Sequence, residues 1–137
     1  IGIPFVMLPV RTLAAVQRAR FDRDAFTRLS RERPIPPIFL FCAETLSAAN
    51  QVHARMFADA YGVPEDPATG SAAVGFARII QAFDGLTDGT HKRAVEQGME
   101  MGRPSSIGLV ITVNRGELEG VRIGGHVVRI AEGKLTV

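Results

Sequence analysis

The sequence predicts an α+β fold in which a curved mixed β-sheet, an open barrel, wraps around one central buried helix. Residues 72–83 are almost all small or apolar, with only Arg78 and Gln81 polar. A helix that is apolar nearly all round is buried between other elements and does not lie on a surface. Most of the remaining chain has the pattern of short strands separated by turns, so we expect a sheet around this helix.

The N-terminal part is expected to form two strands with two short helices between them. Residues 3–10 are apolar but contain two prolines, which predicts a short edge strand. Thr12 is placed to cap a short helix, and residues 22–30 have helical spacing. Proline-rich residues 33–37 end that helix, and the apolar residues 38–43 predict a buried strand.

Residues 52–58 alternate between an apolar face and a face that carries His53 and Arg55. This pattern predicts a strand whose second face lines a polar environment. We interpret His53 as a surface histidine or one with internal hydrogen-bond partners. No second His, Cys or carboxylate has metal-ligand spacing with it, so we assign no metal.

The C-terminal part is expected to be a run of strands. Gly85 suits the left-handed position that ends the 72–83 helix, and residues 84–93 are predicted to form a polar surface loop. The expected strands are residues 94–101, 107–113, 118–123 and 126–131, with a last short one at 134–137, and glycine-containing turns join them.

Composition limits the classes of function. The 137 residues suit one domain, and 46% hydrophobic content with a net charge of +2 is typical of a soluble globular protein. Spread arginines and the absence of Trp argue against a nucleic-acid partner, and no apolar run is long enough to cross a membrane. The single cysteine, Cys42, excludes an internal disulfide, favours a cytoplasmic location and is expected to be a buried inert thiol.

The most informative motif is a short polar turn, residues 66–71, that leads directly into the predicted helix. Such a turn leaves backbone N–H groups unpaired at a helix start, where they and the helix dipole favour an anion such as a carboxylate. We predict a ligand site there, with Asp66 as the catalytic carboxylate and Glu65 as its solvated neighbour. The predicted substrate-binding residues are Thr69, Gly70, Ser71 and Ala72.

The same spacing also fits a structural interpretation. Asp66 would then be the N-cap of the helix and Pro67 its first residue, a common way for a helix to begin. The helix could instead start later, with Thr69 or Ser71 as its cap, which would leave Asp66 in a loop. Spacing leaves both interpretations open.

Several longer motifs resemble the phenazine-biosynthesis-like isomerases and epimerases. They are Arg55-Met56-Phe57, residues 62–73, Glu96-Gln97-Gly98-Met99-Glu100-Met101-Gly102-Arg103-Pro104-Ser105, and Val121-Arg122-Ile123-Gly124-Gly125. The opening Gly2-Ile3-Pro4-Phe5 resembles the start of the second half of these proteins. The match covers nearly the whole chain in the right order.

This resemblance implies a diaminopimelate epimerase-like fold of two similar domains, with an active site in the cleft between them. Residues 1–137 would form a single domain, the C-terminal half, and the N-terminal half would be absent. In the family the aspartate that matches Asp66 contacts the substrate, and the Thr-Gly-Ser turn presents its N–H groups and serine hydroxyl. The implied partners are a small carboxylic-acid substrate, the N-terminal half, and a second subunit in a homodimer.

The implied reaction is a cofactor-free proton shift on a cyclic amino-hydroxy carboxylic acid. The family's main proton-carrying glutamate lies in the N-terminal half, so this chain alone is expected to be inactive. Relatives that use a cysteine pair are a poor match, because the turn has no cysteine. A stand-alone module that binds a small anion or a protein without catalysis remains the alternative.

Overall fold

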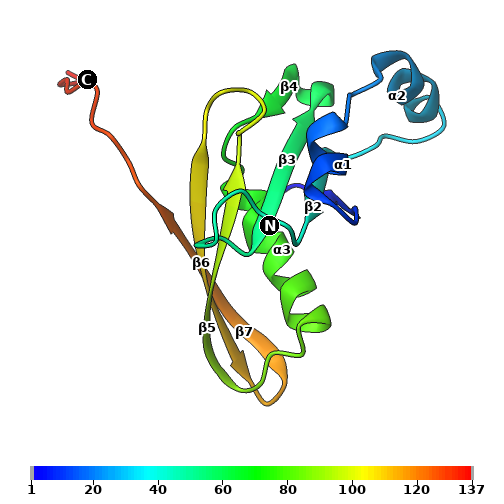
Figure 1. The fold of residues 1–137 in the computed structure, drawn as a ribbon. Helices are drawn as coiled ribbons and strands as arrows, with labels where there is room; N and C mark the ends of the chain where they lie inside the picture. The colour runs from blue at the N-terminus through cyan, green and yellow to red at the C-terminus, as the bar shows by residue number, and fades with distance from the viewer. Residues whose placement is uncertain (1, 137) are drawn as a thin grey trace.

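The computed structural model describes residues 2–136 and contains one open, seven-stranded mixed sheet (Figure 1). The strands are β1 (Val6–Pro9), β2 (Ile38–Cys42), β3 (Val52–Ala58), β4 (Val63–Asp66), β5 (Gly89–Gln97), β6 (Ser105–Asn114) and β7 (Glu117–Gly125). The helices are α1 (Leu13–Arg18), α2 (Arg23–Ser30), the 3₁₀ turn η1 (Asp59–Tyr61) and α3 (Gly70–Phe83). The predicted α+β class and open sheet are confirmed.

The sheet runs in the order β1-β2-β3-β5-β6-β7, and β4 pairs with β3 beside this path. Strand β1 lies at one edge of the sheet, as its prolines predict. It is parallel to β2. The two short helices also begin where expected. Thr12 Oγ1 accepts a hydrogen bond from Ala15 N at 3.2 Å, and Asp22 Oδ1 accepts one from Ala25 N at 2.8 Å. No helix among residues 2–136 has the length and apolar content needed to cross a bilayer.

Strand β3 separates two differently built faces, which confirms the predicted alternation. Val52, Ala54 and Met56 lie in the main apolar core. Phe57 belongs to a smaller cluster on the opposite face, where α1 packs. His53, on that face, is also completely buried. The strand therefore divides an apolar layer from a layer that contains charge.

Helix α3 packs against the apolar face of the sheet. Its buried residues are Ala72, Ala73, Phe76, Ala77 and Ile80, which share a core with residues of β2, β3, β5 and β6. The helix is thus buried on the side that faces the sheet, but the burial expected nearly all round it is not found. The last turn differs, because Phe83 is 84% exposed. Gly85 has φ +60° and follows the helix in the expected left-handed conformation.

The predicted loop at residues 84–93 is wrong, since β5 already begins at Gly89. Its first residue pairs with Val113 of β6 and the antiparallel register continues to Gln97. Residues 89–93 contain no apolar side chain, so the sequence of this part of the strand resembles a surface loop.

The strand expected at residues 126–131 is also wrong. Residues 126–136 have no regular structure and run away from the body of the domain (Figure 1). Val127 and Ile130 are both 93% exposed. Their composition favours a strand, but no neighbouring strand pairs with them in the described part. The strand expected at 134–137 is absent over 134–136, and Val137 lies outside the described residues.

Gly98, just after β5, lies where the backbone comes close to the carbonyl oxygens of Arg103 and Pro67. Gly98 has φ +79°, and a methyl group there would overlap the carbonyl oxygen of Arg103 and lie 2.9 Å from that of Pro67. Gly116 has a similar φ of +76° but open space around it. These two positions separate backbone strain from steric overlap.

We predict that Gly98→Ala lowers the free energy of unfolding by about 3 kcal/mol, through left-handed strain and overlap together. Gly116→Ala, with the strain alone, should lower it by about 1 kcal/mol. Urea unfolding of both variants measures the difference. Equal losses would show that the close approach at Gly98 is not a constraint.

Candidate functional site

The predicted turn joins the end of β4 to the start of α3, and the helix begins without a side-chain cap. Thr69 occupies the N-cap position with φ −98° and ψ 85°, but its hydroxyl does not bond to the helix. It donates to Asp66 Oδ2 at 2.6 Å instead. Asp66 is thus not the N-cap, and the structure matches the later helix start.

The uncapped start leaves backbone donors open. The first helical bond runs from Ala73 N to Thr69 O at 3.0 Å. Within residues 2–136, the N–H groups of Gly70, Ser71 and Ala72 have no hydrogen-bond acceptor. Ser71 is exposed and Gly70 half-buried, whereas Ala72 is completely buried. A ligand can therefore approach the amides of Gly70 and Ser71 more readily than that of Ala72.

Gly70 also has a packing role. A Cβ atom at this position would lie 2.7 Å from Cδ1 of Ile123 on β7. Its φ is not in the left-handed region. The absence of a side chain here thus lets β7 pack against the first turn of α3, independently of any ligand.

Gln97, the last residue of β5, binds the turn through its side chain. The sequence interpretation assigns it no role. Its completely buried side chain accepts from Thr69 N at 3.2 Å and donates to Asp66 O at 2.6 Å. The same amide nitrogen donates to Thr69 Oγ1 at 3.0 Å. Gln97 lies two residues after the core residue Val95, so a polar residue at a core-facing position was the available signal.

The opposite face of β3 and β5 carries a buried charged cluster. His53 Nδ1 lies 2.7 Å from Glu96 Oε1, and His53 Nε2 lies 2.8 Å from Glu100 Oε1. His53 is therefore buried with internal partners, one of the two predicted environments. Among the described residues, no group of three or more His, Cys, Asp or Glu is arranged to hold a metal ion.

Glu96 is ionised inside this cluster. Burial acts to raise the pKa of Glu96, but hydrogen bonds outweigh it and hold the pKa below the ordinary value. The donors to its carboxylate are Leu46 N at 2.6 Å, His53, Asn50 Nδ2 at 2.7 Å and Ser47 N at 3.2 Å. The cluster therefore ties the loop before β3 to the end of β5.

The expectation that Glu65 is a solvated neighbour of Asp66 is wrong. Glu65 accepts two hydrogen bonds from Arg55, both at 2.8 Å, in a bidentate pair. Arg55 also donates to the carbonyl oxygens of Val16 and Ala19. The Glu65 carboxylate is thus used to hold α1 and β4 against β3, and Asp66 is left as the carboxylate of the turn.

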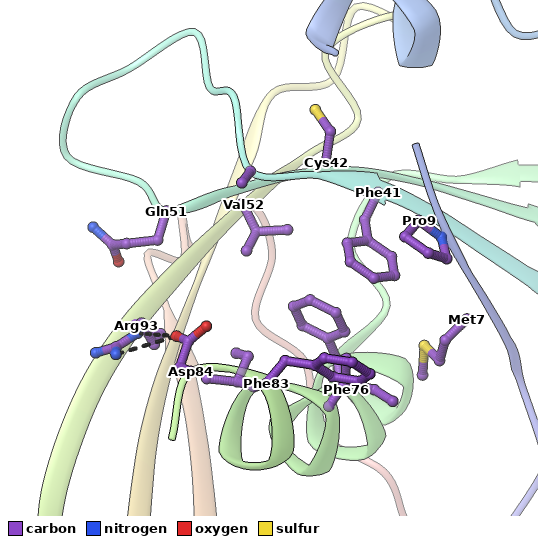
Figure 2. Close-up of a pocket in the computed structure, with 13 residues that line it drawn as sticks. Met7, Pro9, Phe41, Cys42, Gln51, Val52, Phe76, Phe83, Asp84 and Arg93 are labelled. Atoms are coloured by element: carbon purple, nitrogen blue, oxygen red, sulfur yellow. Dashed lines mark hydrogen bonds and ion pairs between the residues drawn. The ribbon is translucent and has the colours of Figure 1, made fainter. Parts of the chain in front are cut away.

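Of the cavities in the described part of the chain, one lies beside the last turns of α3 and another adjoins the turn. A cavity of about 470 Å³ beside the last turns of α3 is lined mainly by apolar side chains, including Phe41, Phe76 and Phe83 (Figure 2). Its two charged residues, Arg93 and Asp84, pair with each other at 3.3 Å. None of the predicted site residues lines it. Another hollow of about 430 Å³ opens beside Ala68 of the turn, and its lining likewise includes none of the predicted site residues.

Cys42 lines the apolar cavity and is buried, as expected. Burial raises the pKa of its thiol, and Sγ lies 3.1 Å from the carbonyl oxygen of Glu44. A protonated, hydrogen-bonded thiol is a poor nucleophile. The turn, with its open backbone donors and the Asp66 carboxylate, therefore remains the candidate site.

The lowered pKa of Glu96 gives a pH-dependent prediction. A carboxylate whose pKa is lower when folded stabilises the protein above its unfolded pKa, about 4.5. That stability is lost as the pH falls through the folded value. We expect Glu96→Gln to lower the free energy of unfolding by about 3 kcal/mol near neutral pH, because it breaks a buried pair.

The loss should shrink when urea unfolding is repeated at a pH below about 4.5, because the stability that the ionised carboxylate contributes is lost as the pH falls toward and through the folded pKa. Glu117→Gln is the matched control, since Glu117 is an exposed partner of Arg78 and should change stability by less than about 0.5 kcal/mol. An identical loss from Glu96→Gln at both pH values would contradict the role given to its charge.

Comparison with known proteins identifies the family. The phenazine biosynthesis-like protein family matches residues 1–133. An uncharacterized isomerase from Mesorhizobium japonicum is 44% identical, over 99% of this chain and 46% of that protein. A trans-2,3-dihydro-3-hydroxyanthranilate isomerase from Pseudomonas chlororaphis is 36% identical, over 66% of this chain and 32% of that protein.

The fold has a match among solved structures. The crystal structure of a Bacillus anthracis phenazine biosynthesis protein of the PhzF family aligns with a TM-score of 0.75 and 27% identity. The alignment covers 89% of this chain and 41% of that protein. The chain spans about half the length of the curated relatives it matches. By the extent of the family match and the 44% identity, this chain belongs to the phenazine biosynthesis-like protein family.

Proposed function

We propose that this chain is the C-terminal domain of a cofactor-independent isomerase that shifts a proton on a small carboxylic acid, bound in a cleft between two domains. The observation that carries the proposal is the uncapped start of α3, where the amides of Gly70 and Ser71 lie open beside the carboxylate of Asp66. The isomerase names of several relatives support it.

The two kinds of group in the turn have complementary chemistry. The amides of Gly70 and Ser71, at the positive end of the 14-residue helix α3, would hold a substrate carboxylate or the negative charge that develops when a proton is removed. Donors fixed before the reaction lower the barrier, because they need no reorganisation. The Ser71 hydroxyl adds a third donor on the exposed side of the turn.

Asp66 would act as the acid-base or orienting group. One of its oxygens, Oδ2, accepts from Thr69, so Oδ1 is the oxygen that can face a substrate. Such a carboxylate can accept a proton from the reacting centre or orient a polar substrate group. The hollow beside Ala68 provides space next to the turn.

The remaining parts of the proposal concern the rest of the enzyme. By the family resemblance, the principal proton-carrying glutamate would lie in an N-terminal half, which would close the cleft over the turn. This chain alone would then be inactive. We further propose a cytoplasmic enzyme that acts as a homodimer.

The experiment is to express the chain with an N-terminal half from the same protein and measure deuterium incorporation from D₂O into candidate substrates, including trans-2,3-dihydro-3-hydroxyanthranilate. We expect exchange in the parent enzyme and a loss on the order of 10²-fold or more in Asp66→Ala. Asp24→Asn, an exposed change on α2, is the control and should exchange at the parent rate.

Undiminished exchange in Asp66→Ala would refute the role of Asp66. Binding of small anions by the two-domain protein, without exchange into any candidate, would favour a binding module over an isomerase.

A further inference from the structure

We infer that Gln97 and Thr69 are positioning residues that fix the Asp66 carboxylate for its reaction. The inference rests on the proposed role of Asp66. Neither side chain needs to touch a substrate: Gln97 is completely buried and Thr69 is 9% exposed. They act on the carboxylate through a chain of two hydrogen bonds.

The direction of each hydrogen bond in this chain follows from its neighbours. The Gln97 side chain faces a backbone N–H, that of Thr69, and a backbone carbonyl, that of Asp66. Its oxygen must face the N–H and its nitrogen the carbonyl, so the amide has one possible orientation. The nitrogen then donates its second proton to Thr69 Oγ1 at 3.0 Å.

The Thr69 hydroxyl is oriented as a consequence. Because it accepts from Gln97, its single proton is free to point toward Asp66 Oδ2, which lies 2.6 Å away. Hydrogen bonds to a charged acceptor are the stronger kind, and a buried chain of them is reinforced by the low dielectric constant. Oδ2 is thereby held, whereas Oδ1 has no hydrogen-bond partner among residues 2–136 and would be the oxygen that a substrate meets.

We call the two hydrogen bonds from Gln97 to Thr69 and from Thr69 to Asp66 the relay. Strand β3 pairs with the backbone at both ends of this relay. Met56 of this strand pairs with Asp66 of β4, and Ala54 pairs with Gln97 of β5. Glu96, which precedes Gln97, is fixed on the opposite face by its four hydrogen bonds. The donor at the start of the relay and the carboxylate at its end are therefore attached to the same strand.

Three substitutions test the relay in the two-domain enzyme, by steady-state deuterium exchange. Thr69→Val keeps the shape of the side chain and removes the hydroxyl, whereas Thr69→Ser keeps the hydroxyl. Gln97→Glu keeps an acceptor for Thr69 N but removes the donor, so the Thr69 proton is drawn to the new carboxylate and away from Asp66. We expect Thr69→Val and Gln97→Glu to lower kcat on the order of 10-fold or more with little change in KM. Thr69→Ser should retain most of the parent kcat, because it keeps the hydroxyl.

Thr90→Val and Gln51→Glu are matched controls. Both residues are exposed and neither contacts Asp66, so both variants should keep the parent kcat and KM. If Thr69→Val exchanges at the parent rate while Asp66→Ala is inactive, the relay is overturned. A parent rate in Asp66→Ala instead overturns the proposed function, which is a distinguishable result.

A second readout needs neither substrate nor the other half. A hydroxyl proton donated to a carboxylate exchanges slowly with water, so the Thr69 hydroxyl of this chain should give a ¹H NMR signal with a cross-peak to the Gln97 side-chain amide, which donates to the same hydroxyl oxygen. The signal should persist in Thr69→Ser and the two controls, and disappear in Thr69→Val. Its absence from the parent chain in the folded state would overturn the relay.

Discussion

The buried side-chain amide of Gln97 must satisfy one acceptor and two donor hydrogens, and it does so entirely with atoms of the turn between β4 and α3. Leaving any of these groups unpaired in a dry interior costs about 1–3 kcal/mol. The turn therefore adopts the conformation in which its atoms satisfy all three hydrogen bonds of the Gln97 amide. In that conformation the Thr69 hydroxyl faces Asp66 and not the helix, so α3 begins without a cap. The open amides and the oriented carboxylate thus have one origin.

Strand β3 holds this arrangement from both of its faces, one apolar and one charged. One face packs on α3 through Ala54 and Met56. The other carries His53 and Arg55, whose carboxylate partners belong to β5, β4 and the turn after β5. Buried charges of this kind contribute little net stability but are strongly unfavourable when one partner is lost. The charged layer therefore fixes where β4 and β5 end, and those ends carry Asp66 and Gln97.

Much of the fold followed from local pattern, and the exceptions have physical reasons. The apolar run of α3, the alternation in β3 and the cap at Thr12 are properties of a few adjacent residues, and all were found as predicted. The start of β5 and the tail after Gly125 depend on pairing with distant strands. Residues 89–93 pair with β6 although their side chains are polar, and residues 126–131 pair with no strand among the described residues. The turn at residues 66–71 does lead into α3, as its sequence indicated, but Gln97 and Glu65 pair with residues far along the chain, which spacing cannot reveal.

Proline at position 70 tests directly whether the open backbone amides at the start of α3 hold an anion. Proline is tolerated as the first helical residue and removes one N–H. Ile123→Ala provides room for it, so the pair to compare is Gly70→Pro and Gly70→Ala, each in that background. In calorimetric titration with sulfate, we expect the proline variant to bind about tenfold more weakly, or about 1.4 kcal/mol. Equal affinities, or no sulfate binding by the Ile123→Ala chain, would show that these amides do not hold an anion.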